Sequence, residues 1–172
     1  MLLNNDPTMN FSKKKKLSDA IRDYAITYGN CSESEAIEHL KHRNGFPKKI
    51  GDQQPYGFDH NYILTNSNAT SNSSLNTAAI LNHPLSNRTL TVRTNVPGLQ
   101  LYTSNYLKND MAFKENAEYK QWQGVCLESQ HFPDSINVEE NNDHDEFVKG
   151  SCIILKPGGD DYEHIIEYQL DF

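Results

Sequence analysis

The spacing of apolar residues changes near residue 55, from the period of a helix to the period of a strand. Upstream of this point, Leu17 to Tyr28 carries apolar residues at three- and four-residue spacing, which predicts a helix. A second helix is predicted over Ala36 to His42, because Ser32 and Glu35 have the spacing of a capping box. Residues 1–54 are therefore interpreted as an N-terminal region with helical character.

Downstream of residue 55, polar and apolar residues alternate as they do in half-buried strands. Strands are predicted at Arg88 to Thr94, Leu99 to Thr103, Phe147 to Leu155 and Tyr162 to Phe172. The turn residues Pro157 to Asp160 separate the last two strands, which predicts an antiparallel hairpin. We therefore expect a mainly β fold, in which residues 55–172 form an antiparallel β-sandwich and the helical region lies at the N-terminus.

Several other segments are polar and are predicted to be solvated. Residues 66–76 and 134–146 hold too few apolar side chains to pack, which predicts loops. The acidic stretch 139–146 lacks the glycine turn that sets ligand geometry in a calcium loop, so it is interpreted as a solvated loop. Lys13 to Lys16 form a basic run that is interpreted in the same way.

Composition and charge limit the classes of function. The formal net charge of −7 over 172 residues argues against a dedicated nucleic-acid-binding protein, which normally has a basic face. No segment approaches the roughly 20 apolar residues of a membrane helix. The N-terminus lacks the order of a secretory signal, so a cytoplasmic location is expected. Cys31, Cys126 and Cys152 include no CxxC pair, which argues against a disulfide framework and against a thiolate zinc site.

The sequence contains no P-loop, GxSxG elbow, HExxH motif or dinucleotide fingerprint. In the segment GFDHNYIL, Asp59 and Asn61 share one face of an extended chain. Together they could hold sugar hydroxyls, since a carboxylate accepts hydrogen bonds and an amide both donates and accepts them. Spacing alone favours another interpretation, in which Asp59 is a local cap at the start of a strand. His60 points to the opposite, apolar face and is interpreted as a structural histidine.

Two further segments place a polar residue among apolar neighbours. Gln100 shares a face with Tyr102 and needs a hydrogen-bonding partner or a ligand there, although an ordinary edge strand explains it equally well. Glu128 shares a face with Cys126 and Gln130, and partial burial would raise its proton affinity into the range of a general base. An interior salt bridge is an equally good interpretation of Glu128.

Taken in order, four segments resemble the successive C-terminal landmarks of the aldose 1-epimerase (galactose mutarotase) family. The segments are GFDHNYIL, TNVPGLQLYTSN, GVCLESQHFPDSIN and ILKPGGDDYEHIIEYQL. The resemblance covers Tyr56 to Phe172, extends more loosely to Asn10 to Ile21 within the N-terminal region 1–54, and implies a mutarotase-like β-sandwich. It also implies that the substrate is a free aldohexose such as galactose or glucose, whose α and β anomers are interconverted without a metal or an organic cofactor.

The resemblance assigns a role to each candidate residue. Glu128 lies at the position of the base that acts on the anomeric hydroxyl, in LESQ where the family more often has ETQ. Asp59 lies at the aspartate that bonds sugar hydroxyls, and Gln100 at the glutamine that lines the site. Such a reaction also requires an acid that protonates the ring oxygen, which in the family is a histidine.

The chain departs from the family pattern upstream of Asp59. The family's histidines lie in segments before that aspartate, whereas this chain has only His39 and His42 before His60, both in a predicted helix that looks like an insertion. We therefore expect the N-terminal half of the sandwich to be missing. Independent activity is accordingly uncertain, and the open sheet edges are expected to pair with a complementary N-terminal half or with a second copy.

Three alternative functions follow from this departure. The chain could be a carbohydrate-binding remnant without catalysis, or an interaction domain. It could also be a fragment of a bifunctional UDP-galactose 4-epimerase/mutarotase. Neither a nucleic acid nor a membrane is expected as a partner.

Overall fold

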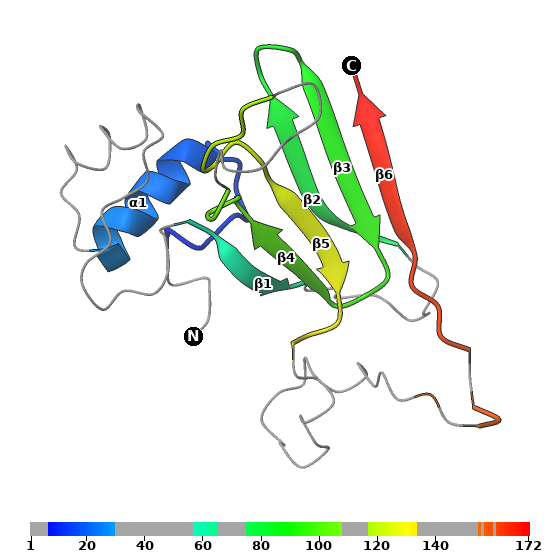
Figure 1. Ribbon diagram of the computed structural model, residues 1–172. Coiled ribbons are helices and arrows are strands. Elements are labelled where there is room, and N and C mark those ends of the chain that lie inside the picture. Colours follow the sequence, from blue (N-terminus) through cyan, green and yellow to red (C-terminus); the bar gives the residue numbers. More distant parts are fainter. Residues whose placement is uncertain are drawn as a thin grey trace. The chain divides into compact units, whose positions relative to one another are not determined.

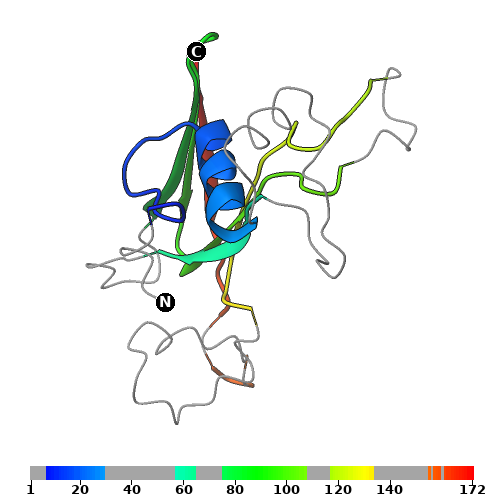
Figure 2. The ribbon, with the colours of Figure 1, turned by 90° about the vertical axis from the view of Figure 1, so that its left-hand side faces the viewer.

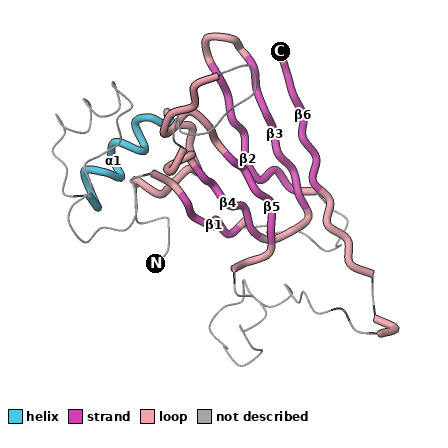
Figure 3. The backbone as a smooth tube through the Cα atoms, in the orientation of Figure 1, coloured by secondary structure: helices cyan, strands magenta, loops and turns pink. Residues whose placement is uncertain are grey.

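The computed structural model describes residues 7–29, 57–64, 75–107, 117–133, 155, 157–159 and 161–172. One helix and six strands lie within these ranges (Figures 1 and 3). The elements are α1 (Leu17–Gly29), β1 (Asp59–Ile63), β2 (Asn76–His83), β3 (Arg88–Thr94), β4 (Gly98–Tyr102), β5 (Cys126–Gln130) and β6 (Ile166–Asp171). The strands form two three-stranded sheets, β1-β4-β5 and β2-β3-β6. The predicted mainly β fold with a short N-terminal helix is thereby confirmed, whereas the sandwich stays a prediction.

The chain forms two compact units. The first contains Met1–Asp59 and Tyr102–Cys126, and the second contains His60–Leu101 and Leu127–Phe172. Helix α1 belongs to the first unit, and most of the strand residues belong to the second. The division of the sequence at residue 55 stays a prediction.

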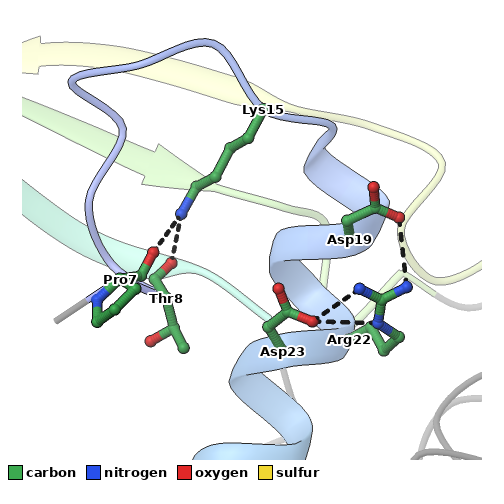
Figure 4. Close-up of polar contacts among 6 residues, drawn as sticks. All are labelled: Pro7, Thr8, Lys15, Asp19, Arg22 and Asp23. Atoms are coloured by element: carbon green, nitrogen blue, oxygen red, sulfur yellow. Dashed lines mark hydrogen bonds and ion pairs between the residues drawn. The ribbon is translucent and has the colours of Figure 1, made fainter.

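Helix α1 confirms the helix predicted over Leu17 to Tyr28. It buries Ala20 and Ile21, which are 1% and 3% exposed. On the opposite side, Arg22 contacts Asp19 at 3.6 Å and Asp23 at 2.9 Å (Figure 4). Exposed ion pairs of this kind stabilise a protein only slightly, so the buried apolar stripe holds the helix in place. The second predicted helix lies outside the described residues.

The segment before α1 loops beside the helix (Figure 2). Lys15 closes this loop, because its Nζ donates to the carbonyl oxygens of Pro7 and Thr8, each at 2.9 Å (Figure 4). The same ammonium lies 4.2 Å from the centre of the Phe11 ring, a cation–π geometry. Phe11 in turn packs edge-on against Phe58, with ring centres 5.1 Å apart. The basic run is therefore only partly solvated, since Lys15 has a structural role.

In the second unit, β2 and β3 form a hairpin (Figure 1). Residues 84–87 make the turn, and Asn87 takes the positive φ of 55° that asparagine tolerates better than most residues. Strand β3 has the predicted bounds. Strand β2 was not predicted, because a register shift between Thr77 and Ala79 interrupts its two-residue period.

Strand β6 pairs antiparallel with β3 but is shorter than predicted. Just before β6 begins, the Asn95 side chain takes the place of a neighbouring strand and bonds backbone groups of residues 163 and 165. Asn95 Nδ2 donates to the Glu163 carbonyl at 3.0 Å, and the Ile165 amide donates to Asn95 Oδ1 at 2.9 Å. The predicted strand at 147–155 lies outside the described residues except for Leu155, as does the loop at 134–146. The described residues therefore do not test the hairpin expected at Pro157 to Asp160.

The pairing of β3 with β6 gives the second sheet an apolar face. Val92 lies opposite Tyr168, and Leu90 lies opposite Leu170. Val92 is fully buried, whereas Tyr168 and Leu170 are 56% and 62% exposed. Burial on this face therefore decreases from β3 toward β6. The buried apolar residues of this unit are Val92, Val96, Leu99 and Leu101.

Candidate functional site

The three predicted site residues lie on the three strands of the β1-β4-β5 sheet, one on each. Gln100 is the middle residue of β4 and is half-buried, and Glu128 is the middle residue of β5 and is exposed. Asp59 is exposed, is the first residue of β1 and belongs to the first compact unit. Gln100 and Glu128 therefore lie on neighbouring strands in the second compact unit, whereas Asp59 is the last residue of the first segment of the other unit.

The partial burial expected for Glu128 is not observed, because its strand turns the next residue toward the second sheet. Ser129 Oγ lies 2.6 Å from Thr94 Oγ1, at the end of β3. Side chains alternate along a strand, so Glu128 points away from this contact. The carboxylate consequently faces outward, where solvent or a ligand reaches it. Burial in the protein is thus not the means by which Glu128 would become a base.

Strands β1 and β4 are antiparallel, and two backbone hydrogen bonds define their register. The Leu64 amide donates to the Pro97 carbonyl at 2.8 Å, and the Thr103 amide donates to the Phe58 carbonyl at 3.1 Å. The alignment that keeps both bonds places Asn61 opposite Gln100 in a pair without backbone hydrogen bonds. Side chains of such pairs lie close together on one face. Asn61 therefore shares the face of Gln100.

Gly98 makes room for the Asn61 side chain. A β-carbon on Gly98 would lie 2.9 Å from Asn61 Oδ1, 3.1 Å from Asn61 Nδ2 and 2.8 Å from the carbonyl oxygen of Gln130. The amide group thus lies against the backbone of β4. Its Nδ2 atom is buried and has no hydrogen-bond partner among the described residues.

In the first unit, Thr103 and Asn105 hold the backbone just before Asp59. Thr103 Oγ1 accepts a hydrogen bond from the Phe58 amide at 2.9 Å and donates to Asn105 Oδ1 at 2.7 Å. Asn105 Nδ2 donates to the Phe58 carbonyl at 2.9 Å. Gly57 is required beside them, because its φ is 141° and a β-carbon there would lie 2.0 Å from Asn105 Oδ1. These contacts set the position from which Asp59 projects.

On the other face of β5, the hydroxyl groups form an ordered chain of hydrogen bonds. Thr94 Oγ1 donates to the Ile165 carbonyl at 3.0 Å, so Ser129 must supply the proton of the Thr94–Ser129 bond. His164 Nε2, 2.9 Å from Ser129 Oγ, must then be the donor to Ser129. His164 therefore uses its Nε2 proton inside the fold.

His131 lies next to this chain of hydrogen bonds. Its ring centre is 6.0 Å from that of Tyr162, and its Nδ1 atom is buried without a hydrogen-bond partner in the described part of the chain. Burial lowers the pKa of His131 below its usual 6.5, and the charge of His164 lowers it further. The neutral form of His131 is therefore favoured in the folded protein.

Sequence reasoning missed several residues that support the site. Thr103 and Asn105 stand in the TNVPGLQLYTSN segment, but their bonds to Phe58 join positions more than forty residues apart, which spacing cannot reveal. Thr94 and His164 were missed for the same reason. Half-buried Cys126 is a thiol. Cys31 and Cys152 lie outside the described residues, as do His39 and His42.

Within the described ranges, α1 is too short and too polar to cross a membrane.

Comparisons with known proteins agree on one family. The sequence model described as aldose 1-epimerase matches residues 7–169. The galactose mutarotase of Homo sapiens is 33% identical over 117 residues, which cover 68% of this chain and 30% of the relative. That of Mus musculus is 39% identical over 88 residues, with coverages of 51% and 24%. The aldose 1-epimerase of Escherichia coli (strain K12) is 37% identical over 81 residues, with coverages of 47% and 21%. The chain thus spans less than a third of the length of these relatives.

Proposed function

The chain belongs to the aldose 1-epimerase family, and from this premise we propose that it binds a free aldohexose and interconverts its α and β anomers. In this proposal Glu128 is the base, while Asp59 and Gln100 bond sugar hydroxyls. Galactose and glucose are the proposed substrates, since they have the hydroxyl groups that a carboxylate and a carboxamide recognise.

The proposed chemistry is a reversible ring opening. Glu128 removes the proton from the anomeric hydroxyl, and the electron pair of that O–H bond forms the carbonyl as the bond between C1 and the ring oxygen breaks. The ring oxygen keeps the electron pair of the broken bond to C1 and takes a proton from an acid. Rotation about the C1–C2 bond then lets the ring oxygen add to the other face of the carbonyl, and the proton transfers run in reverse. A positioned base typically accelerates such a step by roughly 10²–10⁴-fold.

The observation that carries the proposal is the placement of Gln100 and Glu128 at the middle of two neighbouring strands. Neighbouring strands lie about 4.8 Å apart, so both side chains can contact one sugar ring. The Glu128 carboxylate is exposed and can approach the anomeric hydroxyl directly.

A second candidate function is sugar binding without catalysis. The observation that favours it is the direction of the His164 imidazole, whose Nε2 proton goes to Ser129 on the face of β5 opposite to Glu128. His164 is therefore not the acid that protonates the ring oxygen. If no other acid serves the site, water must supply that proton, and the rate gain would be limited to the contribution of the base.

Polarimetry on freshly dissolved α-galactose tests the proposal. We expect the full-length chain to accelerate the change of optical rotation over buffer, and Glu128→Gln to abolish the acceleration while sugar binding persists. Glu163→Gln is the matched control, because Glu163 is also exposed but lies outside the proposed site. If the chain binds galactose without accelerating the change, sugar binding without catalysis is the correct function. If it neither binds nor accelerates, the proposal fails.

A further inference from the structure

The Asn61 carboxamide is held in place by the fold, and its buried Nδ2 atom has no hydrogen-bond partner among the described residues. A buried donor without a partner destabilises a protein by about 1–3 kcal/mol, so such a group requires an explanation, and a bound ligand is one of them. Gly98 leaves the space in which this amide lies, and a β-carbon there would collide with it.

Asn61 occupies the same place in β1 that Gln100 occupies in β4 and Glu128 in β5. Each is the middle residue of a five-residue strand, and the three strands are neighbours in the order β1-β4-β5. The register of β1 and β4 places Asn61 directly opposite Gln100 on the same face. Two strand spacings, about 10 Å, then separate the backbones of Asn61 and Glu128.

We propose that Asn61 is a further sugar-contacting residue, whose Nδ2 donates a hydrogen bond to one hydroxyl of the aldohexose on the side of Gln100 away from Glu128. This inference rests on the proposed function and names the part of the sugar site that recognises a hydroxyl distant from the anomeric carbon. A sugar hydroxyl suits this position because its oxygen accepts the hydrogen bond for which Nδ2 has no acceptor in the described part of the chain.

The side chain can reach a ligand without a change in the fold. Asn61 as a whole is half-buried, so part of it lies at the surface of the sheet. The terminal torsion of asparagine is broad, so the proposal requires only a rotation about it that brings Nδ2 toward the surface. The bond to the sugar then replaces no bond within the described residues, since Nδ2 has none to lose there.

The test is a comparison of galactose with its 2-, 3-, 4- and 6-deoxy analogues, each titrated into the full-length chain and followed by ligand-observed NMR. Asn61→Ala removes the whole amide, and Asn61→Asp keeps the shape but replaces the donor with an acceptor. Asn82→Ala is the matched control, because Asn82 is also a half-buried strand asparagine, bonded to Thr89 Oγ1 at 2.9 Å in the other sheet. Thermal unfolding by circular dichroism checks the fold of each variant.

We expect Asn61→Ala and Asn61→Asp to weaken galactose binding by about three- to tenfold, the size of one hydrogen bond. One deoxy analogue should bind the original chain as weakly as galactose binds Asn61→Ala, and the substitution should not weaken that analogue further. Should Asn61→Ala fail to fold, Asn61→Asp gives the same comparison with the side-chain shape retained.

Three results overturn the inference. Equal galactose affinity in Asn61→Ala and Asn82→Ala shows that Asn61 does not contact the sugar, and the proposed function is unaffected. If Asn61→Ala weakens the binding of galactose and of all four analogues equally, Asn61 supports the fold and does not bond a sugar hydroxyl. The third result, no galactose binding by the original chain, overturns the proposed function as well.

Discussion

The surroundings of His131 make the stability of the folded protein depend on pH. Its pKa is lowered from 6.5, first by burial and then by His164, and its buried Nδ1 has no hydrogen-bond partner in the described chain. The unfolded chain binds the proton more tightly than the folded one, so protonation favours unfolding. The stability contributed by neutral His131 is present above pH 6.5 and is lost as the pH falls below this value.

We predict that the midpoint of urea unfolding decreases as the pH is lowered from 7.5 to 5.5, and that it decreases less in His131→Gln. The control is His83→Gln, since His83 is exposed in the β2–β3 hairpin and its Nδ1 lies 2.8 Å from Ser86 Oγ. The midpoints of all three proteins should be compared at each pH. An identical pH slope in His131→Gln and the original chain would contradict the prediction.

The start of β1 is an element whose position depends on buried side-chain hydrogen bonds. Thr103 and Asn105 are 1% and 4% exposed, and together they hold the amide and carbonyl of Phe58. Asn105→Ala removes the acceptor at 2.7 Å from the Thr103 hydroxyl and one of the donors to the Phe58 carbonyl, which keeps the Thr103 amide as a donor. We predict a loss of about 1–3 kcal/mol in the free energy of unfolding.

Chemical denaturation of Asn105→Ala beside Asn82→Ala measures this effect. Asn82 donates to the Arg88 carbonyl at 3.3 Å and to Thr89 Oγ1 at 2.9 Å in a more accessible place. Asn82→Ala should therefore lower the free energy of unfolding less than Asn105→Ala does. Because the Phe58 backbone precedes Asp59, galactose affinity should also fall in Asn105→Ala. Equal losses of unfolding free energy in the two variants would show that the hydrogen bonds to Phe58 stabilise the protein no more than those of Asn82.

The elements differ in how well the sequence predicts them, for physical reasons. Strand β3 was predicted at its observed bounds because its seven residues keep a strict two-residue period. Strand β2 was missed because of its register shift, and β6 begins late because Asn95 takes over the backbone groups before it. Local pattern thus predicts regular strands and fails where a bulge or a distant side chain intervenes.

The candidate site was predicted only as far as the family motifs reach. These motifs supplied Asp59, Gln100 and Glu128 as candidates, but the expected burial of Glu128 was wrong. Its outward direction follows from the contact between Ser129 and Thr94, which are 35 residues apart, and no local pattern encodes that contact. The roles of the three residues stay predictions.

At the scale of the whole molecule, the exposed apolar side chains of β6 favour association with another chain. Strand β6 is at the edge of the β2-β3-β6 sheet as described, and Tyr168 and Leu170 lie on the same face as buried Val92. An edge strand with an exposed apolar face offers both unpaired backbone groups and apolar area to a second chain. We therefore predict that the expected self-association through open sheet edges uses this strand.

We predict that the chain self-associates as its concentration rises and that Leu170→Lys weakens the association, because a charged side chain is costly to bury in an apolar contact. Gln169→Lys is the control, since it adds the same charge to the opposite face of the same strand. Sedimentation velocity of the three proteins over a hundredfold concentration range measures the shift from monomer to larger species. If both lysine variants weaken association equally, charge alone decides it and the apolar face does not. If the original chain stays monomeric throughout, β6 does not mediate self-association.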